Sequence, residues 1–165
     1  MLNSLIKTLM SLSLVFIFIF STMLFAQAPR MQWHKGYGTN NGEHIHEIMQ
    51  TSDGGYIGIG QTSESGRDCS DILVVKIDSS GAFQWQRIIG SKNQFDVGIC
   101  VTEVKNGYII GGGLFKGNQQ RFLAKLDYKG EIVWQRTYEN KRNGMIRGID
   151  ILPGGQIVAT GYKNC

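Results

Sequence analysis

Short apolar runs alternate with glycine-containing turns over most of the chain. In the run Ile72–Asp78 the side chains of both faces are largely apolar, which is typical of a strand covered on both sides. The stretch FQWQR, residues 83–87, instead alternates apolar with polar side chains, as expected of a half-exposed outer strand. These patterns predict four short strands, at about Ile45–Thr51, Gly55–Gln61, Ile72–Asp78 and Ala82–Ile88.

The same pattern returns after about 50 residues. The stretch KIDSSGAFQWQR, residues 76–87, recurs as KLDYKGEIVWQR, residues 125–136, and the three tryptophans are separated by 52 and 49 residues. A unit of this length with four antiparallel strands has the size of one propeller blade. Because a sheet that is apolar on both faces cannot bury them alone, each copy needs a neighbour. Solenoid coils are the alternative, but their periods are usually shorter.

We therefore predict an all-β chain that forms a partial β-propeller of about two and a half four-stranded antiparallel blades. The repeats span about residues 33–84, 85–133 and 134–165, the last of them incomplete. A closed propeller has at least four blades, so we expect either a fragment of a longer protein or an assembly of several copies. The segment Gln32–Tyr37 is predicted to be an outer strand that closes the last blade of the ring.

Glycine and asparagine in the turns accept the positive φ that tight hairpins require. In each D-x-x-G turn the aspartate can bind the backbone two residues on, while the glycine takes the left-handed conformation. The tryptophan is expected to be a large apolar wedge at the same depth of each blade. The repeated positions expected to be structural are Trp33, Trp85, Trp134, Gly55, Gly107, Gly155, Asp78, Gly81, Asp127 and Gly130.

The spacing W-x-x-x-x-G … DGGYI-x-x-G-x-T … D-x-x-V-x-K-x-D-x-x-G-x-x-x-W resembles a class of secreted bacterial propeller-like repeat proteins. In the second repeat Lys105 replaces the aspartate of DGG. The stretch VVKIDSSGAFQW is also similar to the tryptophan-docking motif of quinoprotein-type (PQQ-like) propellers. This resemblance implies that Asp78 and Gly81 shape a turn and that the tryptophan locks adjacent blades, which concerns the scaffold rather than its chemistry. The chain has no adjacent cysteines and no D-x-[DN]-x-[DN]-G calcium loop, so we expect no cofactor.

The N-terminus has the pattern of a signal peptide: one lysine, the apolar run Leu9–Phe25 and then small residues. We expect a signal helix over residues 1–26, cleaved after Ala26 to leave Gln27 first, because a cut after Ala28 would place a proline next to it. A retained anchor is the alternative, since 17 residues are at the lower margin of a spanning helix. Cleavage predicts a secreted or cell-surface protein with no further membrane association.

Composition adds few constraints on the repeats of residues 27–165. After cleavage 16 basic and 13 acidic side chains remain, and only Lys141 and Arg142 are adjacent basic residues. A nucleic-acid footprint requires basic residues clustered on one face, so we expect no nucleic-acid partner. Cys69, Cys100 and Cys165 are odd in number and lack CxxC spacing, which gives no indication of a zinc site, although export would permit disulfides.

Few residues offer chemistry outside the repeat. His44 and His46 are two apart in EHIHE, so on a regular strand they share a face and could reach one metal; two solvated histidines are the alternative. Lys76 and Lys125 are expected to pack their stems and expose their amines. The non-repeated loop Ser63–Asp71 is a candidate binding loop, or else an ordinary solvated loop.

The resulting hypothesis is a non-enzymatic, exported scaffold that binds a protein or glycan partner or a cell surface. One alternative is part of a quinoprotein-like or glycan-processing enzyme whose active site lies outside this chain, since no serine or cysteine has a visible partner base. Another is a purely structural surface repeat. Apolar faces left open on the first and last blades predict that the isolated chain associates.

Overall fold

The computed structural model describes residues 30–38, 42–63, 69–91, 93–138 and 143–163. The chain divides into two compact units, Met1–His34 and Lys35–Cys165, and the strands described below belong to the second. The expected signal helix and its cleavage site lie outside the described residues. Within the described ranges, no helix is long and apolar enough to cross a bilayer.

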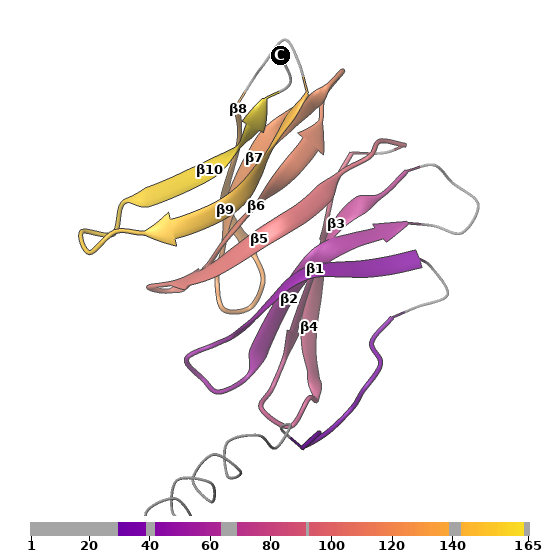
Figure 1. Ribbon diagram of the computed structural model, residues 1–165, viewed down its shortest axis with the longest axis vertical. Helices are drawn as coiled ribbons and strands as arrows, with labels where there is room; N and C mark the ends of the chain where they lie inside the picture. Colours follow the sequence, from indigo (N-terminus) through magenta and orange to yellow (C-terminus); the bar gives the residue numbers. More distant parts are fainter. Residues whose placement is uncertain (1–29, 39–41, 64–68, 92, 139–142, 164–165) are drawn as a thin grey trace, which may run out of the picture. The chain divides into compact units, whose positions relative to one another are not determined.

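The strands form two four-stranded antiparallel sheets and one antiparallel hairpin (Figure 1). The prediction of an all-β chain built from four-stranded antiparallel units is confirmed, and the hairpin supplies half of a third unit. The first sheet contains β1 (Gly42–Gln50), β2 (Tyr56–Ser63), β3 (Asp71–Ile77) and β4 (Phe83–Ile89), and the second contains β5 (Val97–Val104), β6 (Gly107–Phe115), β7 (Gln119–Leu126) and β8 (Ile132–Tyr138). The hairpin consists of β9 (Gly144–Ile151) and β10 (Ile157–Lys163).

Residues 32–37, expected to form an outer strand, have no regular secondary structure. A strand is defined by backbone hydrogen bonds to a neighbouring strand, and no strand within the described ranges pairs with this segment. Alternation of side chains in the sequence indicates an extended segment, but it does not show whether a pairing edge is present.

A β-bulge recurs at the same place in the first strand of each unit. The register shifts at His46 in β1, at Ile99 in β5 and at Arg147 in β9. A second shift, at Gln84 in β4 and Val133 in β8, comes one residue before a tryptophan. Because a bulge bends its strand and changes the direction of the next side chains, the second shift helps to aim each tryptophan.

One apolar core lies between the two sheets. It joins side chains of β2 and β3 to side chains of β5, β6 and β7, and each fully buried aliphatic or aromatic side chain contributes about 1.5–3 kcal/mol. Gly98 permits the close approach, since a Cβ there would lie 2.5 Å from the Ile59 side chain. The buried members are Ile57, Ile59, Ile72, Val74, Ile89, Val101, Tyr108, Ile110, Leu114, Phe122, Ala124 and Leu126.

A second, smaller core joins the second sheet to the hairpin β9–β10. Cys100, Ile109, Leu123 and Ile146 are buried there, and Trp134 packs against them. A Cβ at Gly111 would lie 2.8 Å from Ile146 Cγ2. Close packing of the hairpin on the second sheet therefore explains why residue 111, the first of three consecutive glycines, has no side chain.

The buried thiol in this core provides a test of the packing. Burial, with a smaller effect of Glu47, raises the pKa of Cys100 to about 12, whereas Cys69 is only half-buried. Because the thiolate is the reactive form, we expect native Cys100 to react with iodoacetamide on the order of a hundredfold more slowly than Cys69. Peptide-resolved mass spectrometry would measure both rates, with the chain unfolded in guanidinium as control. Equal native rates would contradict the packing of β5 against β9.

Candidate functional site

The two D-x-x-G turns have the same hydrogen bonds. Asp78 Oδ1 accepts from the backbone N–H groups of Ser80 and Ala82, each at 2.8 Å. Asp127 Oδ1 accepts in the same way from the second and fourth residues after it, at 2.9 and 2.8 Å. Gly81 has φ 76° and Gly130 has φ 80°, the left-handed conformation that favours glycine. The carboxylate closes each turn, which leaves the carbonyl groups of the turn available to other residues.

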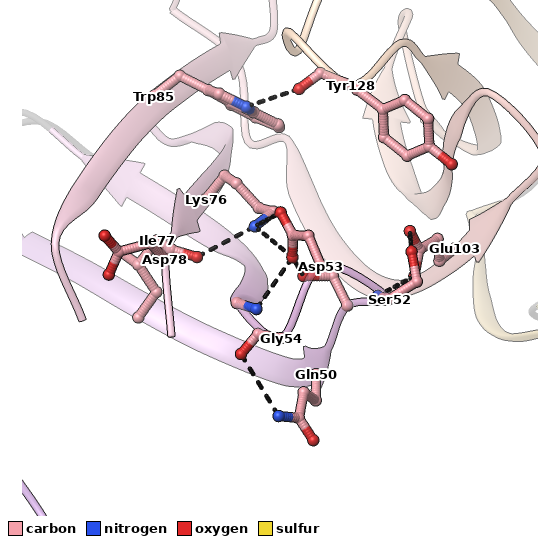
Figure 2. Close-up of polar contacts among 12 residues, drawn as sticks. Gln50, Ser52, Asp53, Gly54, Lys76, Ile77, Asp78, Trp85, Glu103 and Tyr128 are labelled. Carbon is pink, nitrogen blue, oxygen red and sulfur yellow. Dashed lines mark hydrogen bonds and ion pairs between the residues drawn. The ribbon is translucent and has the colours of Figure 1, made fainter. Parts of the chain in front are cut away.

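Trp85 of the first sheet docks on the D-x-x-G turn of the second sheet. Its Nε1 donates to the carbonyl oxygen of Tyr128 at 3.0 Å (Figure 2). The ring covers Gly130, where a Cβ would lie 2.7 Å from Trp85 Cε3. Arg87 Nε donates to the Gly130 carbonyl oxygen at 2.7 Å, and its guanidinium forms an ion pair with Glu131. The docking site thus combines one indole, one guanidinium, two backbone carbonyls and a carboxylate.

Aromatic rings extend this contact into the core. The centroids of Trp85 and Tyr108 lie 6.2 Å apart, and Tyr108 meets Tyr128 edge-on with centroids 5.6 Å apart. Both separations lie in the range of favourable aromatic pairs. Burial raises the pKa of Tyr108, and nearby carboxylates add to this effect. Tyr108 therefore remains neutral and belongs to the packing of the docked tryptophan.

The D-x-x-G turn of the first sheet also receives polar side chains. Lys35 Nζ donates to the Ser80 carbonyl oxygen at 3.0 Å, and the Tyr37 hydroxyl donates to the carbonyl oxygen of Gly81. Lys35 follows Trp33 by two residues, as Arg87 follows Trp85. Trp33 itself belongs to the unit Met1–His34 and is 38% exposed. Each of the two turns therefore presents carbonyl oxygens to a cationic side chain and to a second, uncharged donor.

The expectation that Lys76 exposes its amine is wrong. Lys76 is 1% exposed, and its Nζ lies 3.0 Å from Asp53 Oδ2 and 3.1 Å from the Ile77 carbonyl oxygen (Figure 2). Asp53 also accepts from Thr51 Oγ1 and from the backbone N–H of Gly55. A buried amine needs a charged or polar partner, and the aspartate of the DGG turn provides it.

The second sheet lacks this ion pair. Lys105 takes the position of Asp53, and Lys125 takes that of Lys76. The Lys125 amine donates instead to the Lys105 carbonyl oxygen at 3.4 Å and is exposed, as expected. The first sheet therefore pairs the aspartate with a buried lysine, whereas in the second sheet the aspartate is replaced and the lysine amine is exposed.

The turn glycines serve two different purposes. Gly54 and Gly155 carry the positive φ, 80° and 79°, whereas Gly55 does not. At Gly55 a Cβ would lie 2.4 Å from the Ile77 carbonyl oxygen, and at Gly107 it would lie 1.9 Å from the Leu126 carbonyl oxygen. At Gly155 a Cβ would meet nothing within 4 Å. Gly55 and Gly107 thus share the close backbone approach, although Gly107 also has a positive φ of 136°, and Gly155 corresponds to Gly54.

Two acidic side chains, not singled out in the sequence, connect the first strands of the sheets. Glu47 of β1 accepts from the backbone N–H of Val101 at 2.6 Å. Glu103 of β5 accepts from the backbone N–H and the hydroxyl of Ser52, each at 2.7 Å. Both contacts satisfy polar groups at the junction between sheets, so these acids have a structural use.

A third acid, Asp96, is wholly buried. Its carboxylate accepts from the backbone N–H groups of Ser91 and Phe115, each at 2.5 Å, which ties the segment before β5 to the end of β6. Burial raises the pKa of Asp96, while these two hydrogen bonds oppose the shift. Asp96 is therefore a satisfied carboxylate within the scaffold.

The histidine pair does not lie on a regular strand. His44 pairs with Gln61, but His46 falls at the bulge of β1, where the alternation that would place both side chains on one face is interrupted. Within the described ranges, no group of three or more histidine, cysteine, aspartate or glutamate side chains could hold a metal ion. Metal binding at His44 and His46 stays a prediction. Most of the candidate loop Ser63–Asp71 lies outside the described residues.

Trp134 has the same position in the second sheet as Trp85 has in the first, but it lies beside an open cleft. The cleft has a volume of about 610 Å³ and lies between the second sheet and the hairpin β9–β10. Arg136, the counterpart of Arg87, also lines it. The lining residues are Arg121, Leu123, Trp134, Arg136, Tyr138, Ile146, Ile157 and Ala159. This cleft is the candidate interaction site of the chain.

Comparison with known proteins adds no family. No protein-family model matches the chain, and no curated protein matches it closely enough to indicate a relationship.

Proposed function

We propose that this protein is an exported, non-enzymatic β-repeat scaffold of the tryptophan-docking propeller type, which presents a binding surface to a protein or glycan partner. Its two four-stranded sheets are joined by the docked Trp85 and the turn carbonyl that it binds, and its interaction surface is the open cleft beside Trp134. The signal-peptide pattern of residues 1–26 supports export.

The observation that carries this proposal is that the titratable groups with shifted pKa values make structural contacts. Perturbed pKa values in a cleft are a common mark of catalytic residues. Among the described residues, the groups with shifted pKa values are bound within turns, between sheets or in the core, and none of them lines the cleft. They are Asp53, Asp78, Asp96, Cys100 and Tyr108. Each therefore supports the fold, which favours a scaffold over a catalyst.

Export predicts a defined mature N-terminus. When the full chain is expressed in a Gram-negative host, we expect the chain in the periplasm or the medium to begin at Gln27, because Ala26 ends the signal pattern. Mass spectrometry of the purified protein measures this directly. A variant with Ala26→Arg should retain its leader and remain with the cells. An uncleaved, membrane-bound wild-type chain would contradict the proposal.

The absence of catalysis is tested with a panel of polysaccharides as probes. Saturable binding that leaves the mass of each bound oligosaccharide unchanged would support a binding scaffold. Release of a shortened or oxidised oligosaccharide would show an enzyme and overturn the proposal.

A further inference from the structure

The second sheet repeats the tryptophan and arginine that bind a D-x-x-G turn, but no described turn is docked on them. Trp134 and Arg136 follow Trp85 and Arg87 by 49 residues. Trp85 and Arg87 bind the turn Asp127–Gly130 through two carbonyl oxygens. By contrast, Trp134 makes no hydrogen bond within the described part of the chain, and it lines the cleft together with Arg136. The cleft therefore lies where a third D-x-x-G turn would dock.

The lining of the cleft matches such an occupant in both shape and charge. Leu123, Ile146 and Ala159 supply apolar surface, and Arg121 and Arg136 supply positive charge. Arg121 Nε is buried and has no hydrogen-bond partner in the described structure. In the occupied interface the guanidinium of Arg87, the counterpart of Arg136, is neutralised by Glu131, the residue directly after the turn glycine. A carboxylate at that position of the occupant would meet Arg136.

The hairpin next to the cleft has an open edge. In the first sheet β2 pairs with both β1 and β3, and β6 is flanked in the same way by β5 and β7. Their counterpart β10 pairs only with β9 among the described strands. Its other edge therefore presents backbone donors and acceptors that an added strand can pair with.

We propose that the cleft binds a polypeptide β-hairpin that ends in a turn of the form Asp-x-x-Gly-acid. The first strand of the hairpin adds to the edge of β10, and carbonyl oxygens of its turn accept from Trp134 Nε1 and the Arg136 guanidinium. Its turn glycine lies under the Trp134 ring, and the acid after it pairs with Arg136. This inference deepens the proposed scaffold function, on which it rests, by stating the chemistry of the partner.

The hairpin does not come from the described turns of a second copy. In each chain the turn Asp127–Gly130 is already covered by Trp85 and Arg87. The turn Asp78–Gly81 already gives its carbonyl oxygens to Lys35 and Tyr37. The occupant is therefore a hairpin whose turn carbonyls are still free.

The test uses a synthetic hairpin with the sequence of residues 121–136, cyclised by a terminal disulfide. Cyclisation is needed because an isolated two-stranded hairpin is marginally stable in water, and it lowers the ordering cost of binding. Isothermal titration calorimetry with the chain of residues 27–165 is expected to show one saturable site. A peptide with Gly130→Val should not bind, because even a Cβ at this glycine would lie 2.7 Å from the docking indole in the occupied interface.

Variants of the protein locate the site. Arg136→Ala is expected to weaken binding about tenfold or more, as for loss of a charge-assisted hydrogen bond. Trp134→Phe, which keeps a ring but removes the N–H donor, should weaken it less. Lys105→Ala removes an equal charge from the exposed turn between β5 and β6, outside the cleft, and should leave affinity unchanged. Circular dichroism melting checks that each variant is folded.

Three outcomes would overturn the inference: no binding of the cyclic hairpin, equal binding of the peptide that carries Gly130→Val, or no effect of Arg136→Ala. Self-association that Arg136→Ala abolishes, with no affinity for the hairpin, would identify a second copy as the occupant and would also overturn it. Cleavage at Gln27 and polysaccharide binding are measured separately, so the inference can fail while the proposed function stands.

Discussion

Replacing Trp85 by alanine is expected to lower the free energy of unfolding by about 3 kcal/mol, measured by guanidinium denaturation. Truncating a buried tryptophan typically costs about 3–5 kcal/mol, and the lower end applies because Trp85 is only partly buried. The substitution removes the hydrogen bond to the Tyr128 carbonyl, the cover over Gly130 and the contact with Tyr108. The loss falls on the interface that holds the two sheets together.

Trp134→Ala is the matched control for this prediction. Trp134 occupies the same position in the repeat and packs on a smaller apolar cluster, but it has no docked turn. Its truncation should cost about 1 kcal/mol, the typical effect of a point substitution. Equal losses at Trp85 and Trp134 would show that the docking contacts add nothing to stability.

Asp53→Ala is expected to destabilise the protein by about 2 kcal/mol. Removing one partner of a fully buried ion pair costs about 3–5 kcal/mol because the remaining charge is buried alone. The cost here is lower, since the Asp53 side chain is 54% exposed and solvent screens part of the interaction. Of its partners in the described part of the chain, Lys76 would keep only the Ile77 carbonyl oxygen. Urea denaturation at pH 7 measures the change.

The double variant Asp53→Ala with Lys76→Met tests the reason for this loss. Methionine fills a similar volume without a charge, so the double variant should recover most of the stability lost in Asp53→Ala. If it does not recover any, the loss arises from the turn rather than from the unpaired amine. The comparison separates the hydrogen bonds of Asp53 to Thr51 and Gly55 from its ion pair.

The same carboxylate predicts how stability depends on pH. Hydrogen bonds from Thr51 and Lys76 and from the Gly55 backbone lower the pKa of Asp53 from 3.8 to about 2. A lowered pKa in the folded state means that the contribution is fully present above pH 3.8 and is lost as the pH falls through about 2. The difference in stability between wild type and Asp53→Ala should therefore shrink over this window.

The strands could be predicted from the sequence because their signals are local. Runs such as Ile72–Asp78 are apolar on both faces, and glycine or D-x-x-G turns mark their ends. The observed strand β3, Asp71–Ile77, differs from the expected one by a single residue at each end. The recurrence of a 50-residue unit then indicated that such sheets must cover one another.

The polar contacts between segments could not be predicted in this way. The burial of Lys76 depends on where the DGG turn places Asp53, 23 residues earlier in the chain. The contact from Glu47 to Val101 likewise depends on how two sheets pack. A bulge such as that at His46 shifts the alternation by one residue without changing composition, so periodicity alone placed both histidines on one face.

The docked tryptophan is held by oxygen atoms of the main chain, and this has a consequence for how the repeats can change. The two middle residues of the turns differ completely, Ser79 and Ser80 in one and Tyr128 and Lys129 in the other, although both turns offer carbonyls to donors. Mutations at these positions leave the acceptors in place. Copies can therefore drift apart in surface chemistry, and new ones can arise by duplication, without losing the main-chain acceptors of the docked side chains.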